Sequence, residues 1–210
     1  MSEEKNTKIN NKENIELTAL ELFSKYGFQA VSVRDICKPL GLRESAIYYH
    51  FTNKQGILES LLRRVDKLIQ QMKTEFGAAF SEAVEVSDEA MCAVANGMLQ
   101  GYLLNPVVYK MIAMLTIERI SAQNAQDTYQ KLVFDLPLKQ MEMVFSQMID
   151  KGFIASNAPE VLAQEYYGVI YFAFQKNCIG PELKEENIAL AKQEINQNMR
   201  DIYRKMKYRL

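Results

Sequence analysis

Apolar residues recur every third or fourth position from Ile57 to Phe76, which is the spacing of one face of an α-helix. The pattern lasts about five turns at 3.6 residues per turn, and Asn53 stands just before it as a candidate N-cap. Further helical patterns follow, and no pair of strand-like segments with a hairpin turn interrupts them. The sequence therefore predicts an all-α chain, with later helices over 87–104, 106–122, 125–135, 137–151, 158–178 and 184–207.

The composition is that of a globular protein. The chain has 210 residues, 48% of them apolar, which is enough for a packed core. It has no run of about 18 apolar residues and begins with polar residues of mixed charge, so we expect no membrane span and no signal peptide, and place the protein in the cytosol. Cys37, Cys92 and Cys178 are isolated in apolar surroundings, which predicts buried thiols and no metal site or cofactor.

Three short segments precede the long helix. The first ends at Gly27, which suits a left-handed C-cap. Ser32 and Asp35 form a capping-box pattern at the start of the second, and Gly41 separates it from the third, "RESAIYYHF". Two short helices joined at a glycine form a helix-turn-helix. We expect a disordered tail over 1–9, a helix-turn-helix domain over 10–53 and a helical body over 54–210.

The third segment carries four rings in succession, from Tyr48 to Phe51, and these cannot all face one core. With Ile47 and Phe51 directed inward, the outer face presents Arg43, Glu44, Ser45, Tyr48 and Tyr49. In a helix-turn-helix the second helix enters the major groove of DNA, and tyrosine hydroxyls suit phosphate oxygens. The alternative is that the outward rings pack between head and body.

The stretch "AVSVRDICKPLGLRESAIYYHFTNKQGILESLL" resembles the DNA-binding head of the TetR family of bacterial transcriptional regulators. The resemblance covers about residues 13–62 and includes the first helix ending at Gly27, the "SVRDI" start, Gly41 and "IYYHF..K..IL". It implies a homodimeric regulator in the bacterial cytoplasm, which binds a double-stranded DNA operator through a constant head and a small molecule through a divergent helical body.

The resemblance also implies roles for single residues. Arg34 falls where some members have a base-reading arginine, and Tyr48, His50 and Lys54 fall where the family contacts the DNA backbone. Arg34 or Arg43 is expected to favour guanine, the commonest specific arginine contact. The full predicted DNA-binding set is Ser32, Arg34, Arg43, Glu44, Ser45, Ala46, Tyr48, Tyr49, His50 and Lys54.

Two residues depart from the family pattern. Glu44, at the start of the recognition helix, places a carboxylate near phosphates, where it would pair with Arg43 or accept from a cytosine amino group. Pro39 lies late in the second helix, where proline removes a backbone donor. We therefore expect this helix to end a turn early.

A dimer interface is predicted on the two C-terminal helices, where the family usually forms a four-helix bundle. Apolar residues of the last helix step by three and four, as in a seam for another helix. The alternative is that both helices are buried within one chain. The predicted interface residues are Val169, Ala173, Ile188, Ala191, Ile195, Met199 and Ile202.

Methionines and aromatic residues of the body suit an adaptable ligand cavity, and equally an ordinary helical core. Glu118 and Glu165 would neutralise a cationic ligand, or simply be solvated. The effector predicted from these residues is a small apolar or cationic molecule. The residues predicted to line its site are Tyr102, Met111, Met114, Glu118, Phe145, Tyr166, Tyr167 and Tyr171.

The sequence thus favours a ligand-responsive transcriptional regulator, a repressor released from a palindromic operator by a small molecule. A helical protein-interaction module without DNA binding is the alternative. No catalytic constellation accompanies His50, the single histidine, so we do not expect an enzyme.

Overall fold

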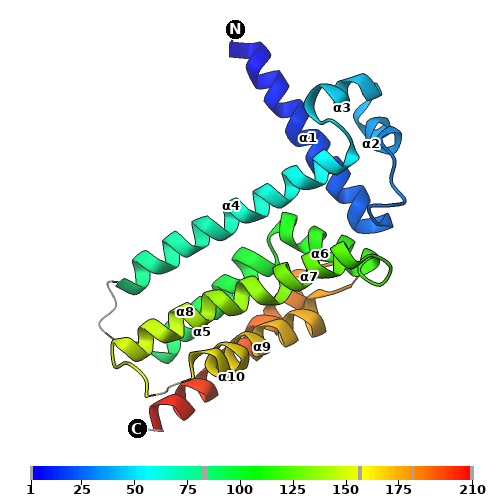
Figure 1. Ribbon diagram of the computed structural model, residues 1–210. Coiled ribbons are helices and arrows are strands. Elements are labelled where there is room, and N and C mark those ends of the chain that lie inside the picture. Colours follow the sequence, from blue (N-terminus) through cyan, green and yellow to red (C-terminus); the bar gives the residue numbers. More distant parts are fainter. Residues whose placement is uncertain (1, 82–84, 156–157, 181, 209–210) are drawn as a thin grey trace. The chain divides into compact units, whose positions relative to one another are not determined.

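The computed structural model describes residues 2–81, 85–155, 158–180 and 182–208, and in these ranges the regular elements are all helices (Figure 1). The all-α prediction is confirmed. The chain divides into two compact units, one of residues 1–70 with 106–131 and one of residues 71–105 with 132–210. Helix α4 runs from the first unit into the second, so this division differs from the predicted boundary after residue 53.

The first unit contains the short helices of the head. It comprises α1 (Ser2–Tyr26), α2 (Val33–Leu40), α3 (Glu44–His50), the first part of α4 (Lys54–Ser81), α6 (Pro106–Glu118) and α7 (Gln123–Gln130). Helix α1 packs against α2, α3 and α6, and its residues Ile15, Ala19 and Phe23 are fully buried. The head and α6 therefore share one core.

The helices of the head begin and end at the capping residues that the sequence predicts. The Ser32 hydroxyl accepts from the Asp35 amide at 3.2 Å, while the Asp35 carboxylate accepts from the Ser32 amide at 3.1 Å, so the capping box is confirmed. Gly27 and Gly41 have φ of 85° and 62°, left-handed values that glycine adopts without strain. The Asn53 side chain caps α4 by accepting from the Gly56 amide.

Two local expectations were wrong. Helix α1 already begins at Ser2, where a disordered tail was expected over 1–9. Helix α2 continues through Pro39 to Leu40 and does not end a turn early. The left-handed cap explains this, because the Gly41 and Leu42 amides bond to Lys38 and Cys37 carbonyls and complete the last turn without a donor from Pro39.

Polar contacts join α1 to α4 inside the first unit. Glu16 is buried on α1, and its carboxylate accepts from the Ser60 hydroxyl at 2.6 Å and from the Arg64 guanidinium at 2.8 Å. Arg64 also donates to Glu13 at 2.7 Å. A buried carboxylate needs such partners, so this network holds the long helix in one register on the head.

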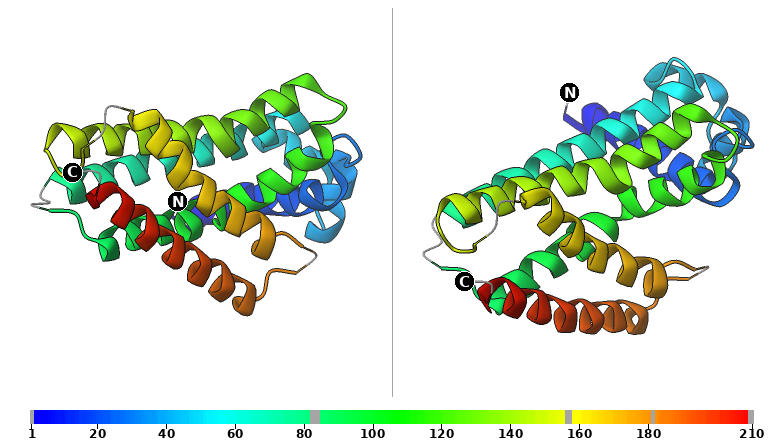
Figure 2. Two further views of the ribbon diagram at one scale, coloured as in Figure 1. Left: turned by 90° about the horizontal axis from the view of Figure 1, so that it is seen from below. Right: turned by 60° about the horizontal axis from the view of Figure 1, so that its bottom comes forward.

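The second unit is a stack of long helices. It comprises the end of α4, α5 (Asp88–Gly97), η1 (Met98–Leu103), η2 (Lys131–Asp135), α8 (Leu136–Asp150), α9 (Pro159–Cys178) and α10 (Glu185–Tyr208). Helix α9 packs between α8 and α10, and α10 also packs on α5 (Figure 2). Fully buried Ile170, Phe174 and Ile195 are part of its core.

Two segments of this unit are π-helical, which the sequence did not predict. The expected helix over 87–104 changes at Met98 from α5 into η1, and the expected helix over 125–135 changes at Lys131 from α7 into η2. Tyrosine hydroxyls of Tyr102 and Tyr167 donate to the Leu132 and Val133 carbonyls of η2, at 2.7 and 2.6 Å. Side chains thus bond to carbonyls in a segment with irregular helical geometry.

The three cysteines are free and buried, as predicted. Within the described ranges, no helix is long and apolar enough to cross a membrane.

Candidate nucleic-acid interface

Helix α3 presents its polar side outward. Ile47 and Phe51 are buried, which confirms the predicted inward pair. Tyr48 and Tyr49 are 51% and 68% exposed, so two of the four successive rings point away from the core. Because Ile47 and Phe51 lie four positions apart on one face, the outward face is fixed by the packing of this helix on the head.

Most of the other predicted DNA contacts are exposed residues of the helix-turn-helix. Arg43 is the N-cap of α3 and has extended backbone. Arg34 lies in the first turn of α2. The exposed set of predicted residues is Ser32, Arg34, Arg43, Glu44, Ser45, Tyr48 and Tyr49, and Ala46 and His50 are half-buried.

The half-buried His50 ring packs edge-on against Tyr49, with the ring centroids 5.0 Å apart, and lies 6.5 Å from Phe51. It thereby supports the outward position of Tyr49. The described residues hold no cluster of three histidine, cysteine, aspartate or glutamate side chains suited to a metal.

The Ser32 hydroxyl is engaged within the head. It lies 2.6 Å from the Asp35 carboxylate, which also accepts from Lys38 at 3.0 Å. The Ser32 hydrogen bond and the Lys38 ammonium hold the pKa of Asp35 well below its usual range. Asp35 therefore stays charged over the ordinary pH range and keeps the start of α2 capped.

Lys54 turns inward, which the sequence did not indicate. Its ammonium donates to the Phe28 and Val31 carbonyls at 2.6 and 2.7 Å and to the Gln29 carbonyl at 3.3 Å. It also lies 4.3 Å from the centre of the Phe28 ring. An ammonium has three donors, so these contacts use the groups that were predicted to hold a DNA phosphate.

The predicted dimer interface is wrong for four of its residues. Ala173, Ala191, Ile195 and Met199 are fully buried within the single chain, so they cannot contact a partner. They belong to the core of the second unit, which is the alternative that the sequence left open. Val169, Ile188 and Ile202 are half-buried. A heptad-like pattern shows that a helix is packed, and does not show which helix it packs against.

A different face of α9 is accessible. Val161 and Phe172 are 51% and 61% exposed, at positions that share one side of the helix. Ile179, the extended residue that follows the end of α9, is 49% exposed. Gly168 lies between them, with open space where a side chain would project. This row, called here the α9 face, was missed because α9 is apolar on nearly all sides.

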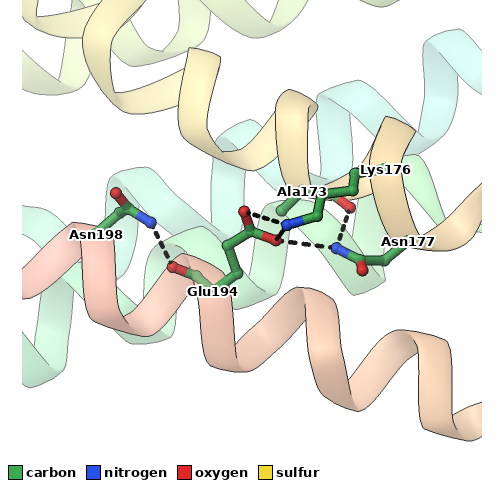
Figure 3. A network of polar contacts seen from close by, with 5 residues as sticks. All are labelled: Ala173, Lys176, Asn177, Glu194 and Asn198. Carbon is green, nitrogen blue, oxygen red and sulfur yellow. Dashed lines mark hydrogen bonds and ion pairs between the residues drawn. The ribbon is translucent and has the colours of Figure 1, made fainter.

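Polar contacts hold α10 beside α9 (Figure 3). The Glu194 carboxylate of α10 accepts from the Lys176 ammonium at 3.2 Å and from the Asn177 amide at 3.1 Å. Asn177 also donates to the Ala173 carbonyl at 3.0 Å. These hydrogen bonds hold α9 and α10 next to each other.

The predicted ligand residues fall in two units. Tyr102, Phe145, Tyr166, Tyr167 and Tyr171 belong to the second unit, where the first four are buried. Phe145 and Tyr166 are in edge contact, and so are Phe134 and Tyr171. Tyr166 donates to the Met91 carbonyl at 2.6 Å, and burial raises the pKa of its hydroxyl above the usual range.

The other three predicted ligand residues, Met111, Met114 and Glu118, lie on α6 in the first unit and are buried there. The Glu118 carboxylate accepts from the Gln29 amide at 3.1 Å. This contact with the head was not expected from the sequence, because the two residues are 89 positions apart.

A family model described as bacterial regulatory proteins of the tetR family matches residues 17–61, which contain the helix-turn-helix. The chain carries a TetR-family head. The "HTH-type transcriptional regulator UidR" of Escherichia coli K12 is 25% identical over 133 residues, which cover 54% of this chain. The aligned part spans 63% of the length of UidR.

Solved structures extend the TetR-family likeness to the fold of the body. A protein assigned to the TetR-family transcriptional regulators, from Mesorhizobium loti MAFF303099, superimposes with a TM-score of 0.73 at 15% identity, over 94% of this chain and 96% of that one. The SmeT–triclosan complex superimposes with a TM-score of 0.67 at 16% identity, over 90% of each chain. The chain therefore shares the fold of these structures over nine-tenths or more of its length.

Proposed function

We propose that the protein is a dimeric, ligand-responsive regulator of transcription that binds a palindromic DNA operator. The observation that carries this proposal is the outward face of α3, where Tyr48 and Tyr49 are exposed while Ile47 and Phe51 anchor the helix. A recognition helix needs such an anchor, because base contacts depend on a fixed orientation in the major groove. Because bacterial DNA lies in the cytoplasm, the proposed protein acts there.

The proposed DNA surface is narrower than the sequence prediction. Arg34 and Arg43 supply charge and bidentate donors for base edges or phosphates. Tyr48 and Tyr49 supply neutral donors at the same surface, and Ser45 lies at the start of α3. Lys54 is left out of the proposed surface because its ammonium is bonded to the α1–α2 loop.

The partner is a second copy of this chain. A single head contacts one half-site, so a palindromic operator requires two. The α9 face supports a bundle contact between copies, since Val161 and Phe172 lie exposed on one side of α9, Ile179 is exposed directly after its end, and α9 is bonded to α10. Exposed apolar rows of this kind mark interaction sites.

The effector is a small apolar or cationic molecule, and the proposed site lies among the aromatic residues of the second unit. Tyr102 and Tyr167 meet the π-helical segment η2, and such segments are frequent at functional sites. Among structures with this fold, SmeT forms a complex with triclosan. Release of operator by the effector would make the protein a repressor.

The test is a salt-dependent titration of the purified protein with fragments of its own genome, including DNA upstream of its gene, with random duplex as competitor. Saturable binding that survives the competitor is expected, and it should weaken at least tenfold in Arg34→Ala/Tyr48→Phe. The matched control is Lys67→Ala, which removes an exposed charge further along α4. Equal weak binding to all duplexes, unchanged by the head variants, would favour the protein-interaction module.

A further inference from the structure

The loop between α1 and α2, residues 27–32, sets where the second helix of the head begins. It starts at the left-handed Gly27 and ends at Ser32, the N-cap of α2. Arg34 follows two positions after the cap. Any movement of this loop therefore moves the proposed base-reading arginine.

Lys54 holds one side of the loop. Its ammonium donates to three carbonyls, those of Phe28, Gln29 and Val31. Burial lowers the pKa of Lys54 below its usual value, and the negative charge of Glu118 opposes that shift. Removing the Lys54 ammonium from water costs free energy, and the hydrogen bonds to the loop carbonyls offset that cost.

Glu118 holds the loop from α6. Its side chain is 8% exposed, and its carboxylate accepts from the Gln29 amide at 3.1 Å. The φ of 85° at Gly27 favours glycine, and a side-chain carbon there would lie 2.6 Å from the same carboxylate, so any other residue would displace Glu118 from the loop. One residue, Gln29, is therefore held by its amide from α6 and by its carbonyl from α4.

These contacts act together because they bind opposite groups of one short backbone segment. The amide side meets a carboxylate, the carbonyl side meets an ammonium, and the charges of Glu118 and Lys54 attract each other. Helix α6 has a second contact with the head, the ion pair of Lys110 with Glu21 on α1, which does not touch the loop. The loop contacts and the helix contact can thus be tested separately.

We infer that Glu118 is a positioning residue for DNA recognition, acting with Lys54 as a clamp on the α1–α2 loop. The clamp fixes the start of α2, and so the place of Arg34, although Glu118 lies outside the segment that matches the TetR-family head. The DNA-binding unit then includes α6. This inference rests on the proposed function for its effect on DNA, while the clamp itself can be observed without DNA.

The experiment compares Glu118→Ala, Glu118→Gln, Lys54→Met and the control Lys110→Ala in the full-length protein. Hydrogen exchange of the Gln29 amide by NMR reports the clamp, and titration of the bound genomic fragment reports recognition. Glu118→Ala is expected to speed Gln29 exchange and weaken DNA binding by roughly tenfold, as for one lost contact to a buried group. Glu118→Gln keeps a carbonyl acceptor and should recover most of both.

The double variant Glu118→Ala/Lys54→Met separates positioning from general stability. If both residues act through one loop, the loss of DNA affinity in the double variant is smaller than the product of the single losses. Lys110→Ala should leave Gln29 exchange and DNA affinity within about twofold of wild type, in line with an exposed ion pair. If Glu118→Ala fails to fold, Lys54→Met and Glu118→Gln still give both readouts.

Unchanged Gln29 exchange in Glu118→Ala would overturn the clamp. Faster exchange with unchanged DNA affinity would overturn its role in recognition, and so would an equal loss of affinity in Lys110→Ala. Absence of specific DNA binding by the wild-type protein would instead refute the proposed function, and the exchange data would still decide whether the clamp exists.

Discussion

The two units of the chain hold their buried polar groups in different ways. In the first unit, buried carboxylates of Glu16 and Glu118 meet an arginine, a hydroxyl and a backbone amide. In the second unit, neutral hydroxyls of Tyr102, Tyr166 and Tyr167 donate to backbone carbonyls. These carboxylates and hydroxyls are all hydrogen-bonded, but the two kinds of hydrogen bond differ in strength.

The difference fits what each unit is proposed to do. Hydrogen bonds to a charged group are stronger than neutral ones, which suits a head that must hold one geometry on DNA. Among the described residues of the second unit, the core around these tyrosines holds no buried charged side chain, which suits a body that accommodates an apolar or cationic molecule. The predictions below test this contrast, from the largest expected effect to the smallest.

Removing a tyrosine ring from the second unit should have the largest effect. Tyr167 is almost fully buried and donates to Val133. Tyr167→Ala should lower the free energy of unfolding by about 3–5 kcal/mol through the cavity it leaves. Tyr167→Phe, which keeps the ring, should lose only about 1–2 kcal/mol for the unsatisfied carbonyl. Equal losses in urea denaturation would show that the hydroxyl, and not the ring, is decisive.

A charge on the α9 face should separate the two copies. Phe172 is exposed in the single chain, and Phe172→Glu would place a carboxylate at the centre of the proposed interface. We expect a loss of about 2–4 kcal/mol in dimerisation, as for a hot-spot residue, seen as a monomer in sedimentation. Met143→Glu on α8 is the control, since Met143 is also exposed and lies off that face. A Phe172→Glu protein that stays dimeric would place the interface elsewhere.

The buried charge of the head is expected to matter more than its exposed neighbour. Glu16→Ala leaves Ser60 without its acceptor and Arg64 with Glu13 alone, and should cost about 1–3 kcal/mol of unfolding free energy. Glu13→Ala removes the other, exposed carboxylate bound to Arg64 and should change stability by less than about 1 kcal/mol. Similar values for the two variants would show that the buried Glu16 carboxylate stabilises the head no more than an exposed one.

The smallest effect is a pH dependence of the capping box. The folded-state pKa of Asp35 is lowered by Ser32 and Lys38, so its contribution to stability is complete above the ordinary aspartate pKa and fades as pH falls below it. Asp35→Asn should therefore unfold at a lower temperature than wild type at pH 7, and the gap should narrow toward pH 3. A gap that stays constant with pH would contradict the assigned charge.

Structural features whose partner residues lie within a few positions in the sequence were predictable. The Ser32–Asp35 capping box, the caps at Gly27 and Gly41 and the inward pair Ile47 and Phe51 follow from spacing alone, because their partners lie within a few positions. The orientation of the aromatic stretch followed from the same rule. The sequence therefore sufficed for these caps and for the outer face of α3, but not for the start of α1 or the end of α2.

Contacts between distant residues were not predictable. Nothing in the spacing around Glu118 indicates the Gln29 amide, and Lys54 has the position of a phosphate ligand while its ammonium is turned into the loop. The apolar row of α10 was predicted to contact a partner chain, but Ile195 and Met199 are buried within the single chain. Periodicity gives the buried side of a helix and leaves its partner open.

The central claim is that two copies of this head bind DNA with sequence preference. The most direct test is selection of bound duplexes from a random library by the wild-type protein and by Arg43→Ala. The account predicts an enriched inverted repeat with half-sites one or more helical turns apart, and a relaxed base preference at one position of each half-site in the variant. No enriched sequence from a dimeric, folded protein would contradict it.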